Sequence, residues 1–158
     1  MTALTDLADE YYEYAISLSP LDLMWSGRLE HLARWNAVSE AERARMRERL
    51  LDYAAKAEGI DPGDDLQALA LRDVIASSAR SSALALTWEP ELLHVNPTMG
   101  AWEMIQSFID AFPLATSEHG EAYLTKLRGM PAFLDALLNA AEAAADEGRV
   151  ALARHLRD

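Results

Sequence analysis

The sequence contains no cysteine, and it has only four histidines and seven glycines. Without cysteine there is no disulfide bond, no thiolate ligand for a metal and no cysteine nucleophile. The glycines do not have the spacing of a phosphate-binding or dinucleotide-binding loop. No Gly-x-Ser-x-Gly turn surrounds any of the serines. The sequence therefore shows no motif of the enzyme classes that are recognised by these short patterns.

Basic residues are also scarce, because 14 Lys and Arg stand against 26 Asp and Glu, a formal net charge of −12. This charge repels nucleic-acid phosphates and anionic membranes, so we expect neither as a partner. No window approaches the run of about 20 apolar residues that a membrane span needs. The acidic N-terminus, MTALTDLADEYYEY, lacks the basic and apolar regions of a signal peptide. We therefore expect a cytoplasmic protein.

The four histidines, His31, His94, His119 and His155, include no pair one helical turn apart, as a zinc-protease helix requires. The inverted motif, His-x-x-Glu-His, fails at Glu30-His31 because Gly27 stands in place of the first histidine. It fails at Glu118-His119 because Ala115 stands there. We therefore predict no catalytic residue, no metal ligand and no cofactor in this chain.

Hydrophobic residues make up 51% of the 158 residues, enough for one domain, 1–158, with its own core. Apolar residues recur at three- and four-residue steps, and period-two alternation is absent, which predicts an all-α bundle of roughly six to eight helices without a sheet. Proline, glycine and capping residues delimit these helices. The expected helices cover residues 4–18, 20–27, 28–36, 40–58, 62–86, 102–112, 117–129 and 131–148.

Residues 87–98 interrupt the helical pattern, because Pro90 and Asn96-Pro97 favour an extended connection. Connections often carry functional residues. The candidate ligand or interface residues are those in or beside this segment: Trp88, His94, Asn96 and Trp102. A lone loop histidine is more often a hydrogen-bonding partner than a ligand, and most aromatic residues in such a chain anchor a helical core.

Several segments resemble, in order, the DUF885 family of bacterial metallopeptidase-like proteins. The segments are LADEYYEYAISLSPLDLMWSG, then Leu71-Arg72-Asp73, then Asn96-Pro97, and then Asp110 to Leu138, DAFPLATSEHGEAYLTKLRGMPAFLDALL. The resemblance implies a mostly helical gluzincin-type protein whose His-Glu-x-x-His zinc helix lies far downstream of these segments. This chain would correspond to the N-terminal helical region, which helps to wall the substrate cleft, and none of the family's catalytic residues can be assigned to it.

The sequence therefore favours a non-catalytic structural or interaction domain. Helices that pack against a larger body keep an apolar face, so we expect the chain to associate with itself or with a protein partner. The alternative is a small helical protein that binds an apolar ligand or a partner peptide among its tryptophans. An enzyme complete in this chain is the least favoured interpretation, given the failed motif searches.

Overall fold

The structure is a computed structural model that describes residues 3–20, 28, 30–87 and 101–148. These residues form five α-helices and no strand, which confirms the all-α prediction with slightly fewer helices than expected. The helices are α1 (Ala3–Ser17), α3 (Glu40–Glu58), α4 (Leu66–Ala85), α5 (Ala101–Ala111) and α6 (Ser117–Asp146). The chain divides into two compact units: a first unit of residues 1–18 and 41–89, and a second unit of residues 19–40 and 90–158.

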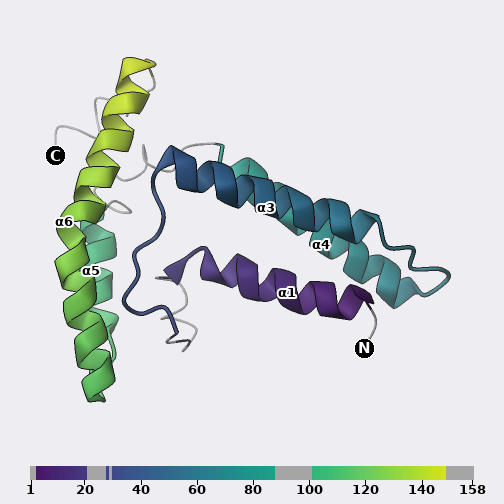
Figure 1. The fold of residues 1–158 in the computed structure, drawn as a ribbon, viewed down its shortest axis with the longest axis horizontal. Helices are drawn as coiled ribbons and strands as arrows, with labels where there is room; N and C mark the ends of the chain where they lie inside the picture. The colour runs from purple at the N-terminus through teal and green to yellow at the C-terminus, as the bar shows by residue number, and fades with distance from the viewer. Residues whose placement is uncertain (1–2, 21–27, 29, 88–100, 149–158) are drawn as a thin grey trace. The chain divides into compact units, whose positions relative to one another are not determined.

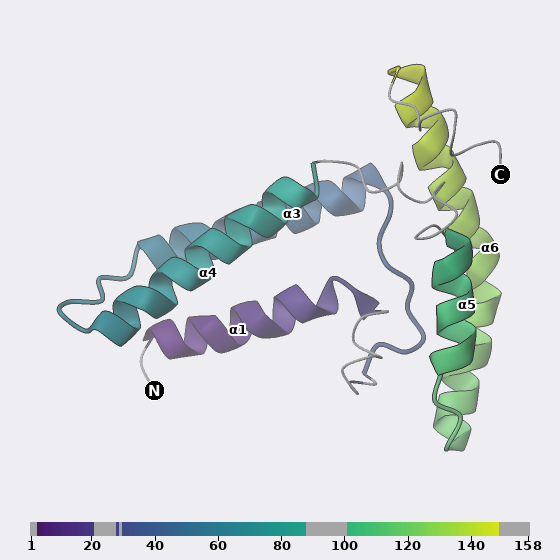
Figure 2. The same ribbon diagram turned by 180° about the vertical axis from the view of Figure 1, so that it is seen from behind.

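In the first unit α1, α3 and α4 lie side by side, and α3 runs antiparallel to the other two (Figures 1 and 2). Each helix contributes an apolar stripe to one core. Alanine dominates the contribution of α3 and α4, and its small side chain lets helix backbones approach closely. The buried cluster consists of Leu4, Leu7, Tyr53, Ala54, Ala57, Ile75, Ala76 and Ala79.

Tyr53 is the largest side chain in this core, and its hydroxyl group reaches a polar partner on another helix. The hydroxyl donates a hydrogen bond to Glu10 Oε1 at 2.9 Å. The guanidinium of Arg49 lies over the ring of Tyr14, 4.7 Å from its centroid. A buried tyrosine requires such a partner, because an unpaired hydroxyl in an apolar core costs stability.

The connection between α3 and α4 shows where the expected helix start was wrong. We predicted a helix from Pro62, but α4 begins at Leu66. Asp65 is the N-cap, and its side chain accepts hydrogen bonds from the backbone N–H groups of Gln67 and Ala68. Asp61 instead accepts from the backbone N–H of Gly63, whose φ of 58° lies in the left-handed region that glycine adopts readily.

In the second unit α5 lies beside α6 and runs antiparallel to it (Figures 1 and 2). Thr116 is the N-cap of α6, as predicted, and its side chain accepts a hydrogen bond from the backbone N–H of His119. The core is aromatic: Leu32, Phe108 and Phe112 are buried together, and Trp35 and Tyr123 pack against them.

The sequence signals at Gly129 and Pro131 predicted a helix boundary, but α6 runs through both residues. Pro131 has no N–H to donate to the helical ladder, so the carbonyl of Leu127 loses its helical donor. Tertiary packing holds this part of α6: the ring of Trp35 stacks on Phe133 with centroids 4.5 Å apart, and its Nε1 donates a hydrogen bond to the backbone carbonyl of Lys126 at 2.9 Å. Packing thus overrides the local breakers. Gly148, with φ of 78°, follows the end of α6, as predicted.

The short helix expected over residues 28–36 is also wrong. Its described residues form a turn, in which the backbone N–H of Arg34 donates to the carbonyl of His31, followed by a segment without regular structure. This conformation lets both Leu32 and Trp35 reach the aromatic core of the second unit. The helix expected over residues 20–27 lies almost wholly outside the described residues.

Candidate functional site

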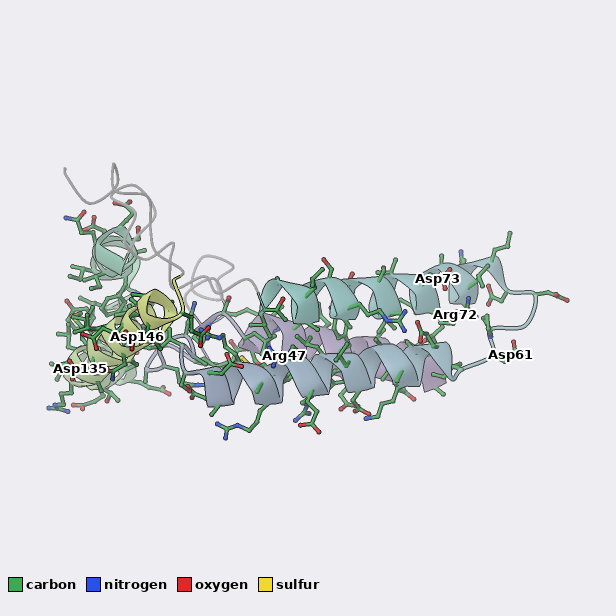
Figure 3. The ribbon with its side chains drawn as sticks, turned by 90° about the horizontal axis from the view of Figure 1, so that it is seen from above. Arg47, Asp61, Arg72, Asp73, Asp135 and Asp146 are labelled. Carbon is green, nitrogen blue, oxygen red and sulfur yellow. The ribbon has the colours of Figure 1, made fainter. Side chains whose placement is uncertain are left out.

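Three of the four candidate residues, Trp88, His94 and Asn96, lie outside the described residues. Trp102 lies in α5, and its side chain is outside the described part of the structure. The prediction of a ligand or interface role for these residues therefore stays a prediction. The Arg72-Asp73 pair of the Leu-Arg-Asp segment lies on α4, toward the end that follows the turn with Asp61 (Figure 3). Its two members bind each other, because Arg72 Nε and Nη2 both donate to Asp73 Oδ1.

Lys126 on α6 is the most unusual buried group of the second unit, because only 1% of its surface is exposed. Its Nζ lies 5.0 Å from the ring centroid of Trp35 and 4.9 Å from that of Phe108. Burial disfavours the charged form and lowers the pKa of Lys126 from 10.5 to about 8. The two rings offset part of that cost, because an aromatic face attracts a cation. A perturbed pKa often marks a functional group, but this amine lines neither of the hollows described below, and its contacts are those of a structural anchor.

A hollow of about 610 Å³ opens in the second unit beside this aromatic core. It lies between Arg28, the turn at residues 30–33 and the first turns of α6. We call it the polar hollow, and its lining consists of Arg28, Glu30, Leu32, Ala33, Glu118, His119 and Ala122. Its volume is within the range of small-molecule sites, roughly 300–1,000 Å³.

One wall of the polar hollow carries an ion pair. Arg28 Nε donates a hydrogen bond to Glu30 Oε1 at 2.9 Å, and Arg28 Nη2 lies 2.8 Å from the same oxygen. The hydrogen bond from Arg28 lowers the pKa of the Glu30 carboxyl group. The guanidinium is therefore already bound to a carboxylate, and an anion entering the hollow would have to compete with Glu30.

The other wall carries a carboxylate and an imidazole. Within the described residues, the side chain of Glu118 has no hydrogen-bond or ion-pair partner, and it is exposed. His119 Nδ1 is buried and likewise has no hydrogen-bond partner in the part of the chain that the structure describes. Buried polar atoms in native proteins almost always have a partner, so this nitrogen calls for an explanation. The two failed zinc motifs, Glu30-His31 and Glu118-His119, thus contribute three of their four residues to one hollow.

A second hollow, of about 500 Å³, lies in the first unit where the N-terminal ends of α1 and α4 meet the α3–α4 connection. Its carboxylates, Asp61 and Asp65, already accept the backbone hydrogen bonds that shape the connection and cap α4. These groups have structural roles, so the polar hollow is the stronger candidate for binding a ligand.

A stripe of apolar residues runs along α6 at alternating steps of three and four residues. We call it the heptad stripe, and it consists of Leu124, Leu127, Pro131, Leu134, Leu138, Ala141 and Ala145. Leu124, Leu134 and Leu138 are 43%, 39% and 58% exposed. A repeat with these steps is the pattern with which one helix packs along another. The continuity of this stripe was not predicted, because Gly129 and Pro131 divide it between two expected helices.

Among the residues that the structure describes, no group of three or more His, Asp or Glu side chains could hold a metal ion. None of the described helices is long and apolar enough to cross a membrane.

Comparison with known protein families gives a match. The family described as "Bacterial protein of unknown function (DUF885)" matches residues 20–158. The resemblance that we saw in residues 7–19 lies outside the matched region, whereas the other segments lie within it. No curated protein matches the chain, and no solved structure matches it.

Proposed function

The chain belongs to the DUF885 family, and from this premise we propose that it is a helical interaction region of a metallopeptidase-like protein, without catalytic groups of its own. In this proposal α6 binds an amphipathic helix of another polypeptide through the heptad stripe. The observation that carries the proposal is the exposure of three leucines, Leu124, Leu134 and Leu138, on one helix at heptad spacing.

The chemistry of the stripe supports a helix as its occupant. Leucine and alanine at heptad positions insert between the side chains of a facing helix, and their burial supplies most of the free energy of such packing. The stripe contains no charged residue over seven positions. A small polar ligand would leave this surface in water, whereas a second apolar helix would cover it.

A second copy of this chain could supply the facing helix, so self-association of the purified chain tests whether the heptad stripe binds a helix. Sedimentation velocity over a range of concentrations is expected to show a species larger than the monomer, and Leu134→Lys with Leu138→Lys is expected to abolish it. A matched control, Leu66→Lys with Leu84→Lys, places the same charges at exposed leucines of α4 and is expected to leave association intact. A monomer at every concentration, or equal loss in both variants, would reject self-association through α6.

The metallopeptidase-like part of the proposal has a separate test. The coding sequence is expected to continue past the codon for Asp158, or to be followed directly, by a segment that encodes a His-Glu-x-x-His helix. The polypeptide encoded there is expected to bind this chain and to lose that binding in the Leu134→Lys, Leu138→Lys variant. If the locus encodes no such helix, the metallopeptidase role is wrong, although the stripe can still bind another protein.

A further inference from the structure

We propose that the polar hollow is a binding site for an organic ammonium ion with an apolar body. The ammonium group binds between the carboxylates of Glu118 and Glu30, and the apolar body lies against Leu32, Ala33 and Ala122. This role concerns a different set of residues from the heptad stripe and does not depend on it.

The charges of the hollow favour a cation over an anion. Its lining carries two carboxylates, Glu30 and Glu118, and one guanidinium, that of Arg28. Arg28 already donates a hydrogen bond from Nε to Glu30, and its Nη2 forms an ion pair with the same carboxylate. Glu118 has no partner among the described residues, so its oxygens are open to N–H donors from a ligand. An ammonium group brings three such donors and a compensating charge.

His119 also belongs to the lining of the hollow. Its Nδ1 is buried away from solvent and has no hydrogen-bond partner within the described residues, so this atom takes no part in the proposed binding.

The apolar part of the lining sets the shape of the ligand. Leu32 is a member of the aromatic core cluster, and Ala122 packs against the same cluster, so the floor of the hollow is fixed by the core of the second unit. A simple inorganic cation would gain nothing from this floor. An amine with an aromatic or aliphatic body would bury apolar surface there while its charged end stays at the rim.

The test uses the full chain and 2-phenylethylammonium as the probe, with backbone amide chemical shifts as the readout. Saturable shifts are expected at residues 30–33 and 118–122. The anion 3-phenylpropionate, of similar size, is expected to produce none. Shifts with both probes would overturn the proposal. So would the absence of shifts with either probe at about 10 mM, since a specific site is expected to have a Kd below that concentration.

Three variants separate the carboxylates from a general effect of charge. Glu118→Gln is expected to weaken binding roughly tenfold or more, because it removes a charge-assisted hydrogen bond. Glu142→Gln is the matched control: it removes the same charge from an exposed position of α6, about 36 Å further along the helix, and is expected to change the affinity less than about twofold.

Arg28→Gln is the sharpest of the three, because it is expected to strengthen binding by releasing the carboxylate of Glu30. If Arg28 is instead the group that binds the ligand, this variant loses binding and the proposal is wrong. The circular dichroism of each variant must match that of the unsubstituted chain before affinities are compared.

Discussion

The two units bury their cores in different ways. In the first unit, alanines let helices approach one another closely, and four of the eight residues in its buried cluster are alanine. In the second unit, large rings fill the space between a non-helical segment and the α5–α6 pair, with Trp35 in contact with both Phe108 and Phe133. A core of small residues has little room for added atoms, whereas a core of rings is sensitive to their removal.

Truncation of a ring in the second unit should have the largest effect. Phe108 is 1% exposed and contacts the rings of Trp35, Phe112 and Tyr123. Phe108→Ala is expected to lower the free energy of unfolding by about 3–5 kcal/mol, measured by urea denaturation. Ile109→Ala is the control on the same helix, because Ile109 is 46% exposed, and it should cost much less. Equal losses would contradict the description of a ring-filled core.

The buried amine of Lys126 makes the stability of the second unit depend on pH. The folded-state pKa of Lys126, about 8, is below its ordinary value of 10.5, so the unfolded chain binds more protons between these values and stability rises with pH in that window. Lys126→Met removes this dependence. The stability of the unsubstituted chain relative to the variant is expected to rise by up to about 3 kcal/mol from pH 8 to 10.5.

The control for this experiment is the chain's other lysine. Lys56 forms an ion pair with Asp52 at 2.8 Å and is exposed to solvent. Lys56→Met should leave the rise in stability between pH 8 and 10.5 in place. If the difference between the unsubstituted chain and Lys126→Met is constant with pH, the amine does not titrate within the core.

Overpacking is the corresponding test of the first unit. Ala79 on α4 is fully buried, so Ala79→Leu must push neighbouring helices apart and is expected to cost about 1–3 kcal/mol. Ala70→Leu adds the same atoms to an exposed position of the same helix, and its effect should stay within about 0.5 kcal/mol. Thermal or urea unfolding measures both. A tolerated Ala79→Leu would show that the helices are not closely packed there.

The smallest expected effect is a gain in stability. Gly120 lies within α6, and a side chain built on it meets no atom within 4 Å. Gly120→Ala is therefore expected to stabilise the chain by about 0.5–1 kcal/mol, because alanine loses less backbone freedom in a helix. Gly129→Ala should gain no more than this, since its new methyl group would contact the ring of Trp35 at 3.5 Å. A loss at Gly120 would indicate a constraint on the start of α6 that the structure does not contain.

Local sequence patterns predicted most helices because their signals and their packing agree. The start and end of the 40–58 helix and the cap at Thr116 are confirmed. The patterns failed where tertiary contacts oppose local preference, as at Pro131, where the contact of Trp35 with α6 comes from a residue about ninety positions away. The polar hollow is not predictable for the same reason, because Glu30 and Glu118 lie 88 positions apart in separate fragments of zinc motifs. No local pattern indicates that they line one space.

The hydrogen bond from the Trp35 indole to the Lys126 carbonyl also affects the order of folding, because it joins residues separated by 91 positions. The chain between them includes α3 and α4, which belong to the other unit. The α3–α4 pair needs only a short loop to close, whereas the second unit must bring together two distant segments, and such non-local contacts form slowly. During synthesis, Trp35 therefore has no site to pack into until the ribosome has released α6. The first unit can form before then, while Trp35 is not yet packed against α6.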